Sequence, residues 1–396
     1  MLMDITKLGK ALRKINSIPI IGCPVLAGFK KLKEVGIILQ IFSIVYLIGV
    51  IAVFAINPAN TEYGPILARL NLSILAINIF ISIILFFYGR GAYTFDKFSQ
   101  KILGTDGHSL MKKHFKKRLS LPLRLPDRTW PRIKVIFLGL MSLFFLVVGI
   151  ILFFIGIFVL SGTDYPIYIL IISGLFISGF YKLKDIVYRK TAIPGEKVLK
   201  NDKRKPVVFL RSFIDDSIME KHENIFFSFL KAIRFEEKLT LFSWQFGPVV
   251  ALGKKEEKLP LAGASREYID DDHWQGKVEE MIEKSSLVYL IIGSTSGLIW
   301  ETKTILEKEN LHKLILVFPP IKKEQILIRW KSLKDTFQDF RRSNVFFDQL
   351  LNLDPNKTLI VGFDKNNKPI VIESKRKEFS YYEAAIASMM HVRESS

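Results

Sequence analysis

The segment SSLVYLIIGSTSGLIWE, residues 285–301, determines which fold the second half of the chain can adopt. It begins with an unbroken apolar run, residues 287–292, which is typical of a strand buried on both faces of a sheet. A turn of glycine and hydroxyl residues follows, and the apolar spacing beyond it predicts a helix over residues 297–311. A buried strand that leads through a short turn into a helix is the repeating unit of α/β proteins.

The same alternation continues on both sides of this segment. The predicted strands are residues 206–213, 247–253, 287–292, 314–318, 358–363 and 369–373. The predicted helices are residues 220–239, 273–285, 297–311, 323–337 and 381–390. The last two strands are separated by DKNNK and are expected to form a terminal hairpin. We therefore predict an α/β domain over residues 206–396, with a mostly parallel sheet covered by helices on both faces.

The first candidate site residues follow the first predicted strand. Ligands of parallel α/β sheets bind at the carboxyl ends of the strands. Arg211, Ser212 and Asp215 stand at that place and supply a cation, a hydroxyl and a carboxylate. We expect all three to contact a ligand. The alternative for Asp215 is that it caps the next helix.

A second candidate, Arg266, stands among small residues in the segment AGASREYIDDDHW, residues 262–274. An arginine in a tight loop suits contact with a phosphate or carboxylate group, and we expect Arg266 to bind a phosphate. Asp272 and Gln275 have the spacing of a capping box, which explains Asp272 without a ligand. The six histidines are scattered without metal-ligand spacing, so no metal site is predicted.

The turn after the central strand holds the remaining candidates. Ser294 and Ser296 lie in a glycine- and hydroxyl-rich turn at a helix start, which suits the binding of an anion. Trp300 and Glu301 follow in the helix. A carboxylate beside an aromatic ring can stabilise or attack the oxocarbenium-like centre of a breaking N-glycosidic bond, so Glu301 is the candidate catalytic group. The alternative is that Glu301 only complements the helix dipole and Trp300 belongs to the core.

The first half of the chain is dominated by four stretches without any charged residue. They are residues 35–61, 70–89, 135–163 and 165–181. Because a helix rises about 1.5 Å per residue, roughly 20 apolar residues cross the hydrocarbon core of a bilayer. We therefore predict four transmembrane helices within residues 35–190 of an integral, multi-pass membrane protein.

The charges between these stretches predict an orientation. Residues 1–196 carry 24 lysines and arginines against 9 acidic residues, clustered before the first stretch, between the second and third, and after the fourth. By the positive-inside rule, both termini and the basic loop 90–134 face the cytoplasm, at the inner membrane in a bacterium. No stretch contains Asp, Glu, Lys, Arg or His, which favours an anchor over a transporter. The positive charge has this cause and does not indicate a nucleic-acid partner.

Two further segments complete the predicted organisation. Residues 1–34 contain an amphipathic segment, expected either to lie in the membrane interface or to pack on the cytoplasmic domain. Residues 191–205 form a linker that contains proline, glycine and several charges. The lysine cluster at residues 112–118 is expected either to attract anionic lipid headgroups or only to set the topology.

The second half of the chain resembles bacterial TIR domains. PVVFLRSFIDD, residues 206–216, resembles their first strand and loop, and residues 285–301 resemble the strand, Ser-containing turn and Trp-bearing helix that hold the TIR glutamate. The same segment is similar to nucleoside deoxyribosyltransferases, in which a Ser/Gly/Thr turn precedes an aromatic–Glu pair. TIR domains place Glu three residues after Trp, where this chain has Lys303; here Glu301 follows Trp300 directly. The resemblance implies a flavodoxin-like, TIR-like fold and cleavage of N-glycosidic bonds, with NAD as a substrate and no cofactor.

Two functions follow from these observations. The first is a membrane-anchored TIR-like enzyme that cleaves NAD or a related nucleotide in bacterial defence or signalling, with Glu301 as its carboxylate. The second is a non-catalytic domain that senses a nucleotide or self-associates and transmits that event to the membrane helices. Both predict a nucleotide ligand, a homo-oligomer and a lipid bilayer with anionic headgroups as partners. Turnover of the nucleotide distinguishes the two.

Overall fold

The fold is described from a computed structural model of the chain. The described residues are 37–38, 40–49, 79, 82, 86, 89–90, 93–102, 132–156, 166–190, 195–212, 235–254, 264–269, 274–308, 310–340 and 347–395. The chain divides into two compact units. We call them the α/β unit (Met1–Leu12, Phe98–Arg128 and Arg189–Ser396) and the helical unit (Arg13–Lys97 and Thr129–Tyr188).

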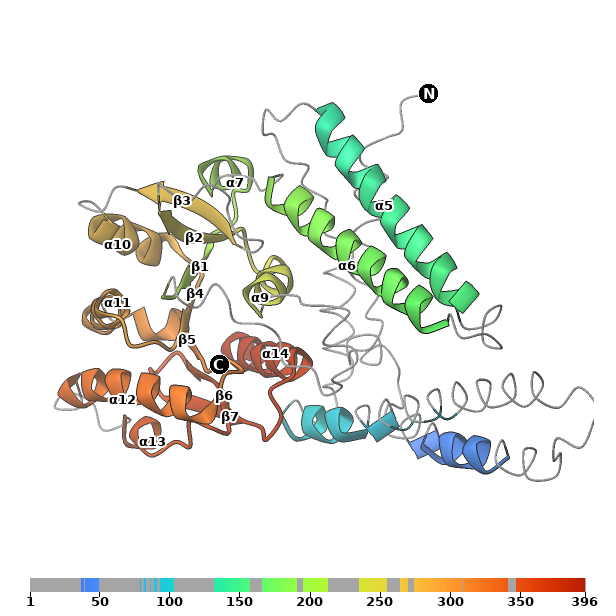
Figure 1. Ribbon diagram of the computed structural model, residues 1–396. Helices are drawn as coiled ribbons and strands as arrows, with labels where there is room; N and C mark the ends of the chain where they lie inside the picture. The colour runs from blue at the N-terminus through green and yellow to red at the C-terminus, as the bar shows by residue number, and fades with distance from the viewer. Residues whose placement is uncertain are drawn as a thin grey trace, which may run out of the picture. The chain divides into compact units, whose positions relative to one another are not determined.

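A seven-stranded sheet forms the centre of the α/β unit, in the order β3-β2-β1-β4-β5-β6-β7 (Figure 1). The strands are β1 (Val207–Leu210), β2 (Val249–Lys254), β3 (Ser265–Ile269), β4 (Leu287–Ile291), β5 (Leu314–Val317), β6 (Thr358–Phe363) and β7 (Pro369–Glu373). The five strands from β3 to β5 in this order pair in parallel. The pairs β5–β6 and β6–β7 are antiparallel, so the predicted terminal hairpin is confirmed and the sheet as a whole is mixed.

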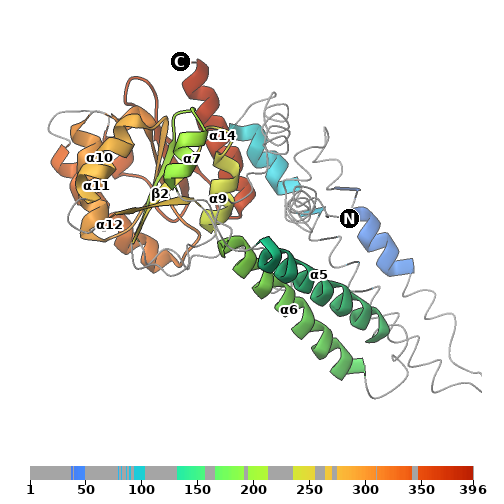
Figure 2. The same cartoon turned by 90° about the horizontal axis from the view of Figure 1, so that it is seen from above.

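Helices cover both faces of the sheet (Figure 2). The helices of this unit include α7 (Gly195–Asn201), α9 (Phe235–Ser243), α10 (Trp274–Lys284), α11 (Ser296–Glu307), α12 (Lys323–Phe340), α13 (Phe347–Leu351) and α14 (Phe379–Ser395). α10, α11 and α12 lie on one face, and α9 and α14 lie on the other. A short 3-10 turn, η4 (Asn310–Lys313), leads into β5.

Strand residues alternate between the two faces, as the period of two in a β-strand requires. Val208 and Leu210 belong to the main apolar core, together with Leu298 and Ile305 of α11 and residues of α10 and α12. Phe209 points to the opposite face, where its ring lies 5.0 Å from that of Tyr289. The sheet is therefore buried on both sides, which explains why β1, β4 and β5 are continuous apolar runs.

α14 is fastened to the sheet by polar contacts with strand carbonyls. The Tyr382 hydroxyl donates to the Phe318 carbonyl oxygen at 2.5 Å. The Arg393 guanidinium donates to the carbonyl oxygens of Phe363, at 3.1 Å, and Leu314, at 2.8 Å. Burial lowers the pKa of Arg393 to about 10, which still leaves its charge intact at neutral pH. These bonds satisfy backbone groups at the ends of β5 and β6.

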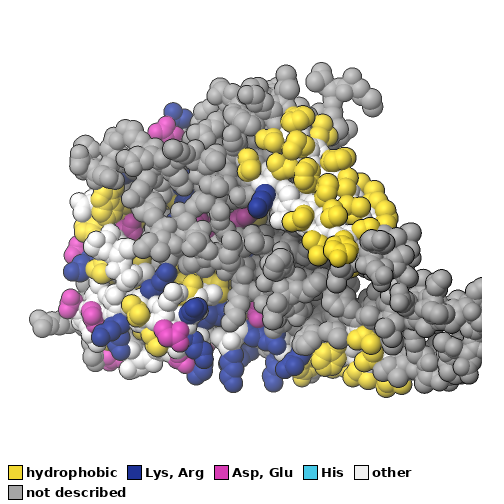
Figure 3. All heavy atoms as spheres, viewed as in Figure 1, with side chains coloured by type: hydrophobic (Ala, Val, Ile, Leu, Met, Phe, Trp, Pro, Cys, Tyr) yellow, Lys and Arg dark blue, Asp and Glu magenta, His cyan; other side chains and the backbone are white. Residues whose placement is uncertain are grey.

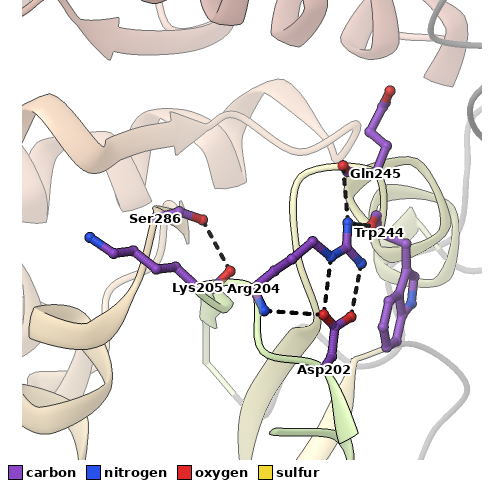
Figure 4. Close-up of polar contacts among 6 residues, drawn as sticks. All are labelled: Asp202, Arg204, Lys205, Trp244, Gln245 and Ser286. Atoms are coloured by element: carbon purple, nitrogen blue, oxygen red, sulfur yellow. Dashed lines mark hydrogen bonds and ion pairs between the residues drawn. The ribbon is translucent and has the colours of Figure 1, made fainter.

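At the amino edge of the parallel strands, Arg204 ties several segments together (Figure 4). Its guanidinium donates to the carbonyl oxygens of Trp244, at 3.1 Å, and Gln245, at 3.2 Å. The same group pairs with Asp202, with Nη2 and Oδ2 2.9 Å apart. Ser286, just before β4, donates to the Lys205 carbonyl oxygen at 3.4 Å. The entries to β1, β2 and β4 are thereby tied together.

The strand order reverses between β1 and β4. Doubly wound sheets bind ligands outside the carboxyl ends of their strands at such a switch point. The parallel order found here, 3-2-1-4-5, also differs from the flavodoxin-like order 2-1-3-4-5 that the resemblance implied. The expectation of a flavodoxin-like sheet is therefore corrected. The strand order differs because the segment SREYI forms an additional strand, β3, which pairs with β2 and extends the sheet on that side.

In the helical unit, α5 (Arg132–Phe154) and α6 (Pro166–Lys190) pair closely. The Ser173 hydroxyl of α6 donates to the Gly149 carbonyl oxygen of α5 at 2.7 Å. A side chain at Gly149 would meet Ile177, and one at Gly179 would meet Phe145, so glycine permits the close approach at both places. Because residues 149 and 145 face residues 177 and 179, the two helices run antiparallel.

No helix in the described part of the chain is both long and apolar enough to cross a membrane. This finding overturns the prediction of four transmembrane helices and of an integral, multi-pass protein with cytoplasmic termini. The bounds of the helices differ from those of the uncharged stretches: α5 begins at Arg132, before its stretch, and α6 continues past its stretch to the charged end at Lys190. Most of the stretch 70–89, the basic loop at 112–118 and the segment 1–34 lie outside the described residues.

Candidate ligand site at the carboxyl edge of the sheet

The turn between β4 and α11 lies at the switch point, on the carboxyl edge of the parallel strands. Ser294 and Ser296 are exposed there, as a ligand contact requires. Thr295 occupies the N-cap position of α11 with extended backbone angles (φ −77°, ψ 147°), but its side chain makes no capping hydrogen bond. The N-terminal amide groups of α11 therefore receive no oxygen from this side chain, and they form the positive end of the helix dipole.

A cation that the sequence did not reveal also reaches this turn. Arg329 projects from α12, and its Nη1 donates to the Ile292 carbonyl oxygen at 3.2 Å. Ile292 is the first residue after β4. The half-buried guanidinium therefore lies directly beside the turn, although it is separated from it by 37 residues in sequence. No local pattern distinguishes Arg329 from the other basic residues of its amphipathic helix.

Glu301 lies in the second turn of α11 and is buried, with 9% of its surface exposed. Among the described residues, no group donates a hydrogen bond to its Oε2 atom. Desolvation raises the pKa of Glu301 from 4.5 to about 8. At pH 7 roughly a tenth of this carboxyl group is therefore ionised. A neutral, buried carboxylic acid in this position is a candidate for proton transfer or for pairing with a cationic ligand.

Two tryptophan rings meet between α10 and α11, and one of them belongs to Trp300, the residue before Glu301. Trp300 of α11 and Trp274, the first residue of α10, are half-buried, with ring centroids 5.0 Å apart and planes at 73°. Both rings pack on the border of the main core. A Cβ atom at Gly297 would lie 3.7 Å from the Trp274 ring, so this ring borders the turn as well. Trp300 was predicted as a site residue from its place beside Glu301, whereas Trp274 was not.

Arg211 and Arg266 meet at a single carboxylate on the opposite face of the sheet. Arg211 Nε lies 2.7 Å from Glu236 Oε2, and Arg266 Nη2 lies 3.1 Å from Glu236 Oε1. The three side chains are almost fully buried, with 2 to 7% of their surface exposed. Glu236 belongs to the first turn of α9. The ion pairs therefore hold α9 against β1 and β3, and removal of one partner would leave a buried charge uncompensated.

The structure thus divides the predicted site residues into two groups. Ser294 lies in the β4–α11 turn, and Ser296, Trp300 and Glu301 lie in the first two turns of α11, the helix that packs with α10 and α12. Arg211 and Arg266 point towards α9 on the other side. Ser212 is buried and is the second residue after the end of β1. Asp215 lies outside the described residues.

A further ionic network links α10 to Glu267, the middle residue of β3. Its Oε1 lies 3.0 Å from Lys277 Nζ, which also lies 3.0 Å from Glu280 Oε2 in α10. Within the described residues, no three His, Cys, Asp or Glu side chains come together in a way that could hold a metal ion.

Comparison of the chain with family models, curated proteins and solved structures finds no match.

Proposed function

We propose that the α/β unit binds a nucleotide at the carboxyl edge of β1 and β4 and cleaves its N-glycosidic bond, with NAD or a related nucleotide as substrate. The observation that carries this proposal is Glu301: a buried carboxyl group with a pKa of about 8, next to a hydroxyl-rich turn at the switch point of the sheet. Unpaired buried carboxyl groups with such a pKa are uncommon outside functional sites.

The groups around Glu301 suit the parts of a nucleotide. Ser294, Ser296 and the N-terminus of α11 can receive phosphate oxygens, and Arg329 adds a positive charge beside them. The half-exposed rings of Trp274 and Trp300 offer apolar surface to a planar base or nicotinamide ring. Arg211 and Arg266, whose guanidinium groups contact Glu236, are assigned to holding α9 on the sheet rather than to the substrate.

The reaction breaks the bond between C1′ of the ribose and the ring nitrogen, and the electron pair leaves with neutral nicotinamide. The positive charge that develops on the ribose favours the ionised form of Glu301, because an opposite charge nearby offsets its desolvation. Water then forms the new bond to C1′, and its proton passes to the Glu301 carboxylate and from there to solvent. Glu301 thus stabilises the cation and accepts a proton in turn.

Release of nicotinamide from NAD by the full-length protein tests this proposal. Glu301→Gln is expected to lower kcat by about 100-fold or more, because the amide can neither ionise nor accept the proton. The matched control is Glu307→Gln, which makes the same change at an exposed position of the same helix. Activity of the Glu301→Gln protein equal to that of the unchanged protein would remove Glu301 from the mechanism.

The pH dependence of the same reaction is a second test. Because the ionised carboxylate is the active form, kcat/KM for NAD is expected to rise with pH up to about 8 and then to level off. If the substrate instead releases a base that must be protonated, the neutral carboxylic acid is the active form. In that case kcat/KM is expected to fall as pH rises through about 8. The direction of the profile therefore identifies the class of leaving group.

A second function, nucleotide binding without turnover, is favoured by the low exposure of Glu301. In this alternative the α/β unit senses a nucleotide or self-associates, as the resemblance to TIR domains also allows. NAD would then raise the midpoint of thermal unfolding of both the unchanged and the Glu301→Gln protein, with no nicotinamide released. Detection of turnover that depends on Glu301 would exclude this alternative.

A further inference from the structure

We propose that the outer faces of α5 and α6 are a docking surface for lipid, with the acyl chains of a bilayer covering their apolar side chains. Large apolar residues are exposed along both helices and form a broad surface (Figure 3). They include Phe137, Phe144 and Ile151 of α5 and Tyr168, Ile172 and Leu175 of α6. Contiguous apolar surface of this extent is rare on proteins that contact only water. The proposal concerns contact with lipid and not a crossing of the bilayer.

The distribution of small and large residues on α5 and α6 indicates that lipid covers their outer faces. Ser142 and Ser173 are buried at 1% exposure, whereas Phe144 is 59% and Leu175 is 66% exposed. The contact between the helices uses glycine and serine, with the Ser173 hydroxyl bonded to the Gly149 carbonyl oxygen. Small and hydroxyl residues between helices, with large apolar residues outside, are the arrangement of helices that contact lipid. A helix pair surrounded by water has the opposite distribution.

Charge complementarity favours an anionic bilayer over a second protein copy. Because the helices run antiparallel, the start of α5, with Arg132 and Lys134, lies at the same end as the last part of α6, which holds Lys182 and Lys184. The basic residues thus gather at one end of an otherwise apolar pair. Between them, α5 and α6 hold six basic residues and one acidic residue, Asp185. Two copies of so basic a surface would repel each other, whereas anionic headgroups would attract it.

Flotation with vesicles tests the proposal on the full chain. Detergent-purified protein is mixed with vesicles of phosphatidylcholine alone or with about 30% phosphatidylglycerol, and the detergent is removed before centrifugation through a density gradient. We expect the protein to float with both vesicles and in larger amount with the anionic ones. Phe144→Asp combined with Leu175→Asp is expected to lower the floated fraction roughly tenfold, because both side chains would enter the apolar region.

The matched control places the same substitutions on the α/β unit. Leu327 and Ile328 of α12 are 48% and 62% exposed, so Leu327→Asp combined with Ile328→Asp changes similar surface outside the helical unit and is expected to float unchanged. Circular dichroism establishes that each variant keeps its helices. If the Asp variant does not, Phe144→Ser combined with Leu175→Ser replaces it, with the same expected direction.

Three results would overturn the proposal. The first is that the unchanged protein stays at the bottom of the gradient with both vesicles. The second is that the α5–α6 variant floats as well as the unchanged protein. The third is a discrete dimer in the absence of lipid that the same variant dissociates, which would make a second copy the occupant of this surface. Equal flotation with neutral and anionic vesicles would overturn the contribution of the headgroups.

Discussion

The buried carboxyl group of Glu301 couples the stability of the α/β unit to pH. Its pKa is about 8 in the folded protein and 4.5 when exposed, so the folded state binds this proton more tightly than the unfolded chain does. The resulting contribution to stability is fully present below pH 4.5. It declines as pH rises and is lost once pH passes the folded pKa, near 8.

Replacement of Glu301 by Gln removes this dependence, because the amide stays neutral at every pH. We expect Glu301→Gln to be more stable than the unchanged protein at pH 9, by up to about 1.4 kcal/mol for each unit of the pKa difference, and nearly equal to it at pH 4.5. Urea unfolding followed by tryptophan fluorescence measures this effect, since Trp244, Trp274, Trp300 and Trp330 all lie in the α/β unit. Glu307→Gln serves as the exposed control. If the difference in free energy of unfolding between the unchanged and Glu301→Gln proteins is the same at pH 4.5 and pH 9, the burial of an unpaired carboxyl group is contradicted.

At the residue scale, the sequence identified groups by type but not by partner. Glu301 stood out because it follows a strand and a hydroxyl-rich turn, and the structure adds its burial. Glu236 could not be recognised, because nothing local separates it from Glu237 next to it; only the fold brings Arg211 and Arg266 to it. Arg329 was missed for the same reason. Partners that are distant in sequence are set by tertiary packing, which a single sequence does not display.

At the scale of elements, apolar runs predicted most strands within a few residues. β4 and β5 lie within their predicted runs, and β6 and β7 match theirs, because each is a continuous or regularly bounded apolar segment. β3 was missed because SREYI is short and carries two charges, as edge strands often do. α7 was read as a linker because its seven residues include a glycine and three charged residues. Propensity alone therefore fails where pairing with a neighbour decides the structure.

Gly247 and Gly276 differ in whether the fold leaves room for a side chain. A Cβ atom at Gly247 would collide with the carbonyl oxygen of Lys205, a backbone group that cannot move aside, whereas one at Gly276 in α10 would meet nothing within 4 Å. Gly247→Ala is expected to lower the free energy of unfolding by about 2 kcal/mol or more. Gly276→Ala is expected to raise it by about 0.5–1 kcal/mol, because alanine favours the helix. Urea unfolding of both variants checks this pair, and similar effects of the two substitutions would contradict the packing at the entry to β1.

At the scale of the whole molecule, the two edges of the sheet have separate roles. Arg204 ties the amino edge together, whereas Glu301 and its neighbours lie at the carboxyl edge. Arg204→Ala is expected to lower the free energy of unfolding by about 1 kcal/mol, a modest value because 41% of this side chain is exposed. Its kcat/KM for NAD is expected to stay within about twofold of the unchanged protein, since the hydrogen bonds of Arg204 lie at the edge opposite the switch point. A large loss of turnover with unchanged stability would contradict this division.

The first half of the chain shows that amino-acid composition alone does not predict which helices cross a membrane. The uncharged stretches of the first half predicted apolar helices, and α5 and α6 do overlap two of them. The inference from apolar length to four bilayer crossings does not hold for the described residues. Composition reports what a segment avoids, which is water. It does not report how the segment is bounded or what covers it.

Both outer strands of the sheet are poor templates for another chain. β7 has five residues and begins with Pro369, which lacks an N–H group, and β3 has five residues that include Arg266 and Glu267. The backbone of β3 at Arg266 is also approached by Gly195 at the start of α7. Short, charged or covered borders resist the addition of a further strand. Copies of the α/β unit would therefore associate through helices and loops. Strand addition at the two borders of this sheet, which is the route to extended fibrils, is disfavoured.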